Sequence, residues 1–416
     1  MTSSSIISTC PFCGSSDLHL IADYGETGLC DDYRQTASPV TTYPLRLLLC
    51  KNCLLSFIDC VVDPSLIYED YIYLTSSSPG LQAHFKNYAD AVATAFLTDI
   101  DHSHYCIDIG GNDGTLLDSL PKSSEMRLLN IEPSAAASLA SRSKGIDTYN
   151  GYFNSSAVDY ILAQGKPSLV FMNNMFANIP DVHSFVRNLS LLFDDQTVAV
   201  IESSYLVDMV RSNVIDFVYH EHLYYLSLCP LQKLLGTFGL EIFDFQQVET
   251  KGGSYRYFIS PIGARLVSHR VSTQLACEQA FIQSSEYSRW FEKTVSMISD
   301  LTSSLSVSQQ SEICIYGASA TTTTLLQLLP SSWSYSFMVD DNPAKHAKYS
   351  PTSPSLKVQT FDFLVEETPP VILIAAWRFL DLIVAKLNSI PNYNPLIIVP
   401  LPVAKVFRLS QYTPNP

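Results

Sequence analysis

Short apolar runs alternate with amphipathic segments along the central and C-terminal parts of the chain. In HYCIDIGGNDGTLLDSL, an apolar run at residues 106–109 is followed by a glycine-rich turn and by Leu116, Leu117 and Leu120 on one helical face. Further units of this kind begin at PSLVFMNN and EICIYGAS. A polar, amphipathic stretch from about residue 268 to 309 predicts one or two connecting helices. Alternating strands and helices predict an α/β fold with parallel sheets.

The chain length divides these units among several domains. A chain of 416 residues is too long for one core and fits two or three domains. We predict a small unit at residues 1–66, a central α/β unit at 67–249 and a C-terminal α/β unit at 250–416. A hydrophobic content of 47% with 16% charged residues is typical of a well-buried globular protein.

Charge and termini exclude some classes of partner. The net charge of −15 argues against nucleic acid, since proteins that bind phosphate backbones normally present a basic face. The N-terminus MTSSSIISTC lacks the features of a signal peptide, and no apolar run approaches the ~18 residues of a membrane span. We therefore expect a cytoplasmic protein that is not bound to a membrane, with its ten cysteines present as reduced thiols or metal ligands.

Two C-x2-C pairs lie in the first unit. CPFCG contains Cys10 and Cys13, and CKNCL contains Cys50 and Cys53. Each pair can present two thiolates to one tetrahedral Zn²⁺. Four thiolates leave no open position for a catalytic water, so the predicted zinc is structural. The alternative is four free structural cysteines.

The glycine-rich turn predicts a cofactor site. Its spacing differs from the G-x-G-x-x-G of dinucleotide sites. Asp108, two residues before the first glycine, suits the cationic amino-acid portion of S-adenosylmethionine better than a pyrophosphate. Glu132, 24 residues further on, can accept hydrogen bonds from both ribose hydroxyls. The predicted cofactor contacts are Asp108, Gly110, Gly111, Asn112, Gly114, Glu132, Asn173 and Asn174. The alternative is an α/β domain that binds another adenine nucleotide.

The stretch VIDFVYHEHLYYLSL, residues 214–228, places two histidines around a glutamate in an aromatic strip. It can be a metal site, a general-base cluster or a buried strand. A metal site is disfavoured because H-E-x-x-H, and not H-E-H, brings two histidines together on a helix. If the segment is extended, His220 and His222 face one side. If it is a turn, Tyr219 and His222 share a face.

Taken in order, these segments resemble the three-domain sugar C-methyltransferases that act on nucleotide-linked ketodeoxysugars. The resemblance covers nearly the whole chain, through GETGLCDDY, YEDYIYLTSSS, DIGGNDGTLL, NIEPS, FMNNMFANIPD, YHEHLYYLSL, KGGSYRYFIS, IYGASATTTTLL, VDDNPAKHAKYSP and ILIAAW. It implies a small N-terminal zinc-binding domain, a central Rossmann-like class I methyltransferase domain that binds S-adenosylmethionine, and a C-terminal Rossmann-like α/β domain. The sugar nucleotide is then expected between the last two.

The resemblance also implies catalytic roles. It assigns the base to Tyr219 or His222; we favour His222, assisted by Tyr219. Glu221 is expected to orient His222 or to contact the sugar, and His220 to support the segment. A second active-site tyrosine is implied at Tyr73, whose alternative role is packing between the first two domains.

Substrate contacts are predicted at Asn178, Lys251, Ser254, Arg256 and Thr321. Arg256 offers a fork for a phosphate, and threonine hydroxyls near residue 321 can hold a diphosphate. The alternative for the C-terminal unit is a scaffold. The chain departs from the family pattern at these positions: it has asparagine and lysine in place of histidine at 178 and 251, Thr321–Thr323 in place of Lys-Gly-Asn, and Ala-Trp-Arg at 376–378 in place of Pro-Trp-Asn.

The leading hypothesis is an S-adenosylmethionine-dependent C-methyltransferase of a nucleotide-linked ketodeoxysugar, which removes a proton next to the ketone. Its partners would be the nucleotide sugar, S-adenosylmethionine and structural Zn²⁺, with no nucleic acid and no membrane. The oligomeric state stays open, and a monomer is compatible with the sequence. The alternatives are an O- or N-methyltransferase of a sugar or small metabolite, and a non-catalytic zinc-knuckle binding module.

Overall fold

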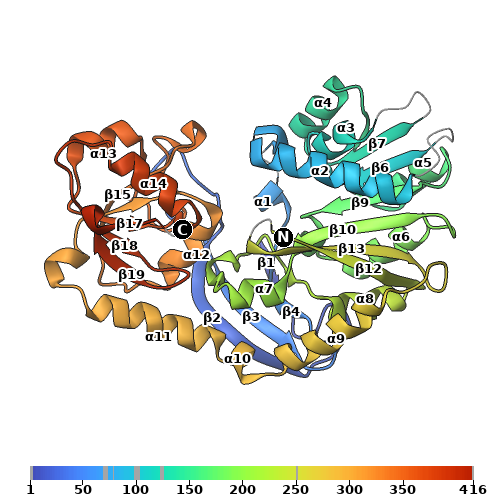
Figure 1. The fold of residues 1–416 in the computed structure, drawn as a ribbon, viewed down its shortest axis with the longest axis horizontal. Helices are drawn as coiled ribbons and strands as arrows, with labels where there is room; N and C mark the ends of the chain where they lie inside the picture. Colours follow the sequence, from blue (N-terminus) through green and yellow to red (C-terminus); the bar gives the residue numbers. More distant parts are fainter. Residues whose placement is uncertain are drawn as a thin grey trace.

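Three main sheets organise the protein, and a row of helices joins the two larger ones (Figure 1). The computed structural model describes residues 3–68, 74–77, 79–97, 104–121, 126–249 and 252–414. The predicted α/β class, with a small N-terminal unit before two Rossmann-like units, is confirmed. No helix within the described ranges is long and apolar enough to cross a membrane.

The N-terminal unit is an antiparallel sheet with the order β11-β4-β3-β2. Its strands are β2 (Leu18–Gly28), β3 (Thr42–Cys50), β4 (Ser56–Ile58) and β11 (Tyr224–Tyr225), while β1 (Ser4–Ile6) pairs separately with β5 (Cys60–Val62) and α1 (Ser65–Tyr68) follows. Strand β11 comes from the VYHEHLYYL segment and pairs with β4, so the unit directly supports that segment.

The central unit is a seven-stranded sheet with the order β12-β13-β10-β9-β6-β7-β8. Its strands are β6 (Tyr105–Ile109), β7 (Arg127–Glu132), β8 (Asp147–Asn150), β9 (Leu169–Asn173), β10 (Val198–Ser204), β12 (Leu240–Val248) and β13 (Ser254–Pro261). Strands β6 to β10 are parallel. The inner strands β6, β7, β9 and β10 are mostly apolar and buried, since helices cover both faces of the sheet, whereas the edge strand β8 is polar and partly exposed. The helices are α2 (Pro79–Phe96), α3 (Thr115–Ser119), α4 (Ala135–Ser143), α5 (Ser155–Leu162), α6 (Val182–Ser190), α7 (Leu206–Arg211) and α8 (Leu228–Gly236), with η1 (Thr75–Ser77), η2 (Phe176–Asn178) and η3 (Ile215–Phe217) as short 3₁₀ turns.

Strand β13 places the end of the central sheet later than the predicted boundary. The sequence assigned KGGSYRYFIS to the C-terminal unit, which was predicted to begin at residue 250. In the structure, Ser254–Pro261 pairs antiparallel with both β10 and β12. Because β13 is hydrogen-bonded to two strands of the central sheet, it is part of the central unit.

The predicted helical connection is present, but as three helices in place of one or two: α9 (His269–Ile282), the single-turn α10 (Ser285–Ser288) and α11 (Trp290–Ser303), which run along the bottom of Figure 1 to the C-terminal unit. That unit is a sheet with the order β16-β15-β14-β17-β18-β19. Its elements are β14 (Ile313–Tyr316), α12 (Ala320–Gln327), β15 (Tyr335–Val339), β16 (Val358–Gln359), α13 (Phe361–Glu367), β17 (Val371–Ile374), α14 (Leu380–Leu387), β18 (Leu396–Val399) and β19 (Lys405–Arg408), with η5 (Val307–Gln310), η6 (Pro343–Lys345), η7 (Trp377–Phe379) and η8 (Leu409–Gln411) between them. Within the described part of this C-terminal sheet, the strand pairs are parallel except for the edge pair of β18 with β19, which is antiparallel.

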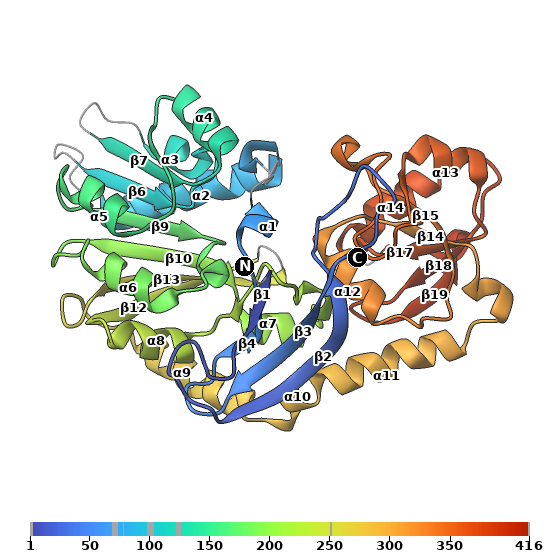
Figure 2. The same cartoon turned by 180° about the vertical axis from the view of Figure 1, so that it is seen from behind.

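The chain between β2 and β3 reaches from the N-terminal unit to the C-terminal unit (Figure 2). Arg34 and Tyr349 exchange two backbone hydrogen bonds, of 3.0 and 2.7 Å. The ammonium of Lys345 lies 2.6 Å from the carboxylate of Asp31. One apolar core extends through all three units, so the interfaces that bound the candidate site are continuous with the core.

Candidate active site

The four predicted zinc ligands come together in the N-terminal unit. The Sγ atoms of Cys10, Cys13, Cys50 and Cys53 all lie within 4.8 Å of one another, with 3.4 Å between Cys10 and Cys53 and 3.5 Å between Cys13 and Cys50. Sulfurs around a tetrahedral Zn²⁺ with bonds of ~2.3 Å lie about 3.8 Å apart, so the cluster fits a zinc ion. No other group of three or more potential ligands converges in this way within the described part of the chain, which includes His220, Glu221 and His222.

The cysteine cluster is coupled to the segment that follows the His-Glu-His sequence. The ring of Phe12, between the first two cysteines, packs edge-on against Tyr224 with 5.0 Å between centroids. Lys233 donates a 2.8 Å hydrogen bond to the carbonyl of Asn52, which lies between the other two cysteines. A zinc ion in the cluster would therefore stabilise the support of β11.

The glycine turn after β6 is too tight for a larger residue. A Cβ built at Gly111 would lie 2.7 Å from the Asp108 carboxyl and 2.5 Å from Oδ1 of Asn130. Directly after it, the backbone N–H of Asn112 donates to Glu132 at 3.0 Å, and its carbonyl accepts from Asn130 at 2.8 Å. The predicted cofactor residues of β6 and β7 thus form one connected group.

Several buried polar side-chain atoms on β6, β7, β9 and η2 lack a hydrogen bond of good geometry within the described protein, although Asp108 and Asn173 lie close enough to interact. They are Oδ1 of Asp108, Oδ1 of Asn130, both polar side-chain atoms of Asn173 and Oδ1 of Asn178. Burying such an atom unpaired costs about 1–3 kcal/mol, so this set is arranged for a ligand. It lies in the crevice where open α/β sheets bind their ligands.

The electrostatics of this crevice favour a cationic ligand. Burial raises the pKa of Asp108 to about 8, and the neighbouring Glu132 carboxylate adds to the increase. A positive group beside Asp108 would restore its ionised form. Glu132 is buried and accepts hydrogen bonds from the backbone of Asn112 and Ser134, which leaves lone pairs for hydroxyl donors. These residues fit the amino-acid and ribose portions of S-adenosylmethionine.

The VYHEHL segment forms a turn and not a strand. The backbone N–H of His222 donates to the carbonyl of Tyr219 at 3.0 Å. As the turn alternative predicts, the Tyr219 hydroxyl lies 3.4 Å from Nε2 of His222, and their rings are 4.4 Å apart. The Phe217 ring packs against both, at 5.4 Å from Tyr219 and 5.0 Å from His222. A phenol and an imidazole are therefore adjacent, and Glu221 between them is partly exposed.

His220 faces the N-terminal unit. Its Nε2 lies 3.1 Å from the carbonyl of Pro44, and its ring packs edge-on against Tyr43. Burial lowers the pKa of His220, so the neutral imidazole donates from Nε2 to that carbonyl. His220 links the turn to strand β3, whereas its neighbour His222 lines a small cavity.

That cavity lies between the turn and the ends of strands β9 and β10. It is lined by Asn174, Ala177, Ser203, Ser204, Tyr205, Leu206, Met209, Phe217, His222, Tyr224 and Tyr225. Asn174 directly follows β9, and Ser203 and Ser204 end β10, next to the strands that carry Asp108 and Asn173. His222 therefore lies where the central sheet presents its strand ends.

Comparisons with known proteins agree with this arrangement. Residues 10–68 match the family described as "Putative zinc binding domain", residues 81–244 match "Methyltransferase domain", and residues 249–402 match "C-methyltransferase C-terminal domain". The C-methyltransferase NovU of Streptomyces niveus is 25% identical over 412 residues, which cover 96% of this chain and 97% of that protein. The chain belongs to the three-domain C-methyltransferases.

Solved structures also match parts of the chain. An S-adenosylmethionine-dependent methyltransferase from Clostridium acetobutylicum is 13% identical and covers 48% of this chain and 96% of its own, with a TM-score of 0.34. The magnesium protoporphyrin IX methyltransferase of Synechocystis is 12% identical, covers 42% of this chain and 81% of its own, and has a TM-score of 0.32. From the family matches, this C-methyltransferase uses S-adenosylmethionine and has a zinc-binding domain.

The predicted substrate residues of the C-methyltransferase lie in different surroundings. Asn178 lies in η2 with a buried amide oxygen, and Ser254 begins β13. Thr321 is buried in α12, with its hydroxyl 3.0 Å from that of Ser319. Tyr73 and Lys251 lie outside the described residues. The roles of all five stay predictions.

The predicted phosphate fork, Arg256, is only 4% exposed. Its Nε lies 2.5 Å from the carboxylate of Glu202, and its guanidinium lies 3.8 Å from the ring centroid of Tyr88. Glu202 also contacts Nε2 of His84 at 2.6 Å. These contacts satisfy the guanidinium inside the central unit, on the side covered by α2.

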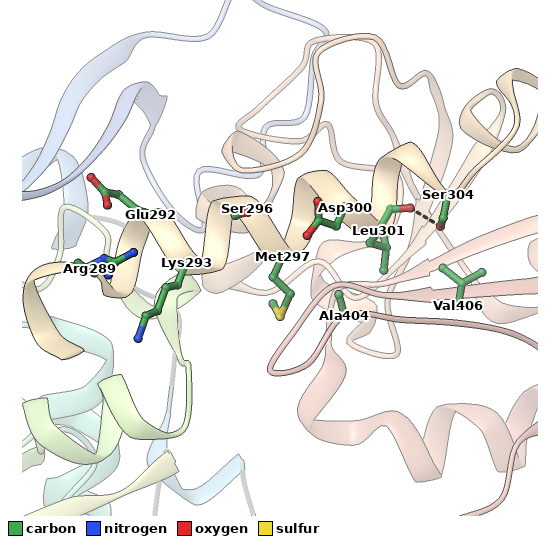
Figure 3. Close-up of a pocket in the computed structure, with 10 residues that line it drawn as sticks. All are labelled: Arg289, Glu292, Lys293, Ser296, Met297, Asp300, Leu301, Ser304, Ala404 and Val406. Carbon is green, nitrogen blue, oxygen red and sulfur yellow. Dashed lines mark hydrogen bonds between the residues drawn. The ribbon is translucent and has the colours of Figure 1, made fainter. Parts of the chain in front are cut away.

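Ser203, Ser204 and Asp216 were not among the site residues predicted from the sequence. The first two follow the buried run VAVIE, and the same pattern of a buried run ending in small polar residues identified Asn173 and Asn174. A cavity of about 790 Å³ between α11 and β19 contains none of the predicted site residues (Figure 3). Of the residues predicted for the site, Asn174 and His222 line the smaller cavity.

Proposed function

We propose that this C-methyltransferase acts on a nucleotide-linked ketodeoxysugar, from which it removes a proton next to the ketone before methyl transfer. The observation that carries the proposal is the pairing of Tyr219 with His222, whose imidazole lines a cavity next to the strand ends of the central sheet. A carbon nucleophile requires a base and a donor for the enolate oxygen, and this pair offers both.

His222 is the proposed base. Its imidazole takes the α-proton and becomes imidazolium, while the electron pair moves into the ketone to form the enolate. The Tyr219 hydroxyl, 3.4 Å from Nε2 of His222, donates to the enolate oxygen or relays the proton. Glu221 orients the imidazole or contacts the sugar. When bound, S-adenosylmethionine would supply the electrophilic methyl group: the enolate carbon bonds to it as the methyl–sulfur bond breaks, and S-adenosylhomocysteine is the leaving group.

The other predicted site residues fall into two groups, one for the cofactor and one for the sugar nucleotide. Asp108, Asn112, Glu132 and Asn173 would hold the cofactor, with Gly110, Gly111, Gly114 and Asn174 shaping the crevice around it. Asn178 and Ser254 of the central unit and Thr321 of the C-terminal unit would contact the sugar nucleotide, which we place between these two units. Support comes from the matched C-methyltransferase C-terminal domain and from the resemblance of the motifs to the sugar C-methyltransferases.

The test measures carbon-acid chemistry directly. Wild-type protein is incubated with a panel of nucleotide 4-ketosugars in deuterium oxide without cofactor, and exchange at the α-carbon is followed by NMR. We expect exchange with at least one ketosugar, and methyl transfer to the same carbon when S-adenosylmethionine is added. Methyl transfer to oxygen or nitrogen without exchange would favour the alternative reaction, and absence of both would exclude the proposal.

Two histidine variants provide the matched comparison. Removing a general base lowers turnover by about 10²- to 10⁴-fold, so His222→Gln is expected to lose exchange and methyl transfer together. His220→Gln keeps a donor towards the Pro44 carbonyl and changes a residue that faces away from the cavity. It is expected to lower the melting temperature with little effect on kcat. Equal losses of kcat in the two variants would contradict the assignment of His222.

A further inference from the structure

The buried carboxylate of Asp216 joins the C-terminal unit to the turn that carries His222. Asp216 lies in η3, immediately before that turn, and is 0% exposed. The indole N–H of Trp377 donates to its Oδ2 at 2.9 Å, and Nη2 of Arg378 donates to its Oδ1 at 3.3 Å. Both donors lie in η7, directly after β17.

Two further contacts tie the same segment to the C-terminal unit. Thr324 of α12 donates a 2.7 Å hydrogen bond to the carbonyl of Val218. The guanidinium of Arg378 stacks on the Trp377 ring at 4.2 Å and lies 5.9 Å from the Phe217 ring. The residues on both sides of Phe217 are therefore held by the C-terminal unit.

Phe217 links these contacts with the C-terminal unit to the phenol of Tyr219 and the imidazole of His222. Its ring contacts the rings of both Tyr219 and His222, and Phe217 and His222 line the small cavity. A change in the position of Asp216 would shift Phe217, and with it the distance between the phenol and the imidazole. A buried, hydrogen-bonded carboxylate has few alternative positions, because any movement leaves its charge without partners.

We propose that Trp377 and Arg378 are positioning residues that hold the Tyr219–His222 pair in its reactive arrangement through Asp216. The inference rests on the proposed role of His222 and adds that the C-terminal unit sets the geometry of the base. Trp377 and Arg378 act through Asp216 and Phe217 and touch no reacting atom.

The test compares two tryptophan variants. Trp377→Phe removes the indole donor to Asp216 and keeps an aromatic ring under Arg378. Trp290→Phe is the matched control, because the indole of Trp290 donates a bond of the same 2.9 Å length to Oδ1 of Asn213, near the start of the same segment. Losing a hydrogen bond to a buried charge costs about 1.5–3 kcal/mol, so Trp377→Phe is expected to lower kcat about 10- to 150-fold with unchanged KM for S-adenosylmethionine.

A substrate-independent readout separates this inference from the proposed function. Histidine labelled with ¹³C at Cε1 gives an NMR signal for His222, assigned by its loss in His222→Gln. Trp377→Phe and Arg378→Gln are expected to move that signal and its titration midpoint, Arg378→Lys to restore them in part, and Trp290→Phe to leave them unchanged. An unchanged His222 signal in folded Trp377→Phe and Arg378→Gln would overturn the positioning role, whatever the substrate. If wild type exchanges no α-proton but the signal moves, the proposed reaction fails and the positioning role stands.

Discussion

Replacing Gly111 with alanine is the most direct test of the cofactor turn. A Cβ at this position would lie 2.7 Å from the Asp108 carboxyl and 2.5 Å from Oδ1 of Asn130. Carbon contacts below 3.0 Å are essentially never found, so at least two side chains must move. Neither can move freely, because Asp108 is 2% exposed and Asn130 is fully buried.

The expected effect follows from what those side chains do. Overpacking of a closely packed site costs about 1–3 kcal/mol. Asp108 and Asn130 both carry polar atoms that we assign to the ligand-binding crevice, so relief of the clash displaces them from the ligand. If that cost falls on the bound state, the Kd for S-adenosylmethionine rises about 5- to 150-fold.

Isothermal titration with S-adenosylmethionine measures the effect, and Gly236→Ala is the control. Gly236 ends α8, and a Cβ there meets nothing within 4 Å. That variant should bind the cofactor as wild type does, and its helix should be slightly more stable. Wild-type affinity in folded Gly111→Ala would refute both the packing argument and the position of the cofactor.

Three further predictions concern stability and metal content. Burial and the neighbouring Glu132 raise the pKa of Asp108 from 3.8 to about 8. Between these two pH values the folded, cofactor-free protein keeps a proton on Asp108 that the unfolded chain loses. The contribution of Asp108 to the free energy of unfolding therefore falls as the pH rises from about 4 to 8. Thermal unfolding across that range should show a smaller decline for Asp108→Asn, and an identical decline would contradict the shift. Elemental analysis should find zinc lost from Cys50→Ser and retained in Cys277→Ser, whose thiol is exposed; retention in both would exclude the cysteine site. In urea unfolding, Arg256→Met should lower the free energy of unfolding by about 3–5 kcal/mol, because it leaves the buried Glu202 carboxylate with a weaker partner. Arg270→Met, which removes an exposed ion pair, should lower it by less than about 1 kcal/mol. Similar decreases in the two variants would argue that Arg256 is free for a ligand.

The parts of the fold that depend on local pattern could be predicted from the sequence. The cysteine pairs determine one cluster because few residues offer thiolates and both pairs have the same short spacing. The glycine turn with its preceding acid could be recognised because each residue performs a local task. The prediction that Tyr219 and His222 share a face required only that the segment be a turn, and the structure supplied that choice.

Long-range pairing set the limits of prediction. Nothing in KGGSYRYFIS shows that this segment pairs with β10, because a strand does not encode its partner locally. From the sequence alone, the guanidinium of Arg256 was predicted to bind a phosphate, because its partner Glu202 lies 54 positions earlier in the chain. The role of Asp216 could not be predicted either, because its hydrogen-bond donor Trp377 belongs to the C-terminal unit.

The turn that carries the proposed base is held by all three units at once. His220 contacts Pro44 of the N-terminal unit, Val218 accepts a hydrogen bond from Thr324 of the C-terminal unit, and the N–H of Leu223 donates to Ala177 of the central unit at 2.8 Å. A turn fixed from three sides has little freedom to rearrange, which keeps its phenol and imidazole at a constant separation. The zinc-binding domain, which lies away from the cofactor crevice, thereby contributes to the geometry of the reaction. This explains physically why a C-methyltransferase would keep a zinc cluster that has no open coordination position for chemistry.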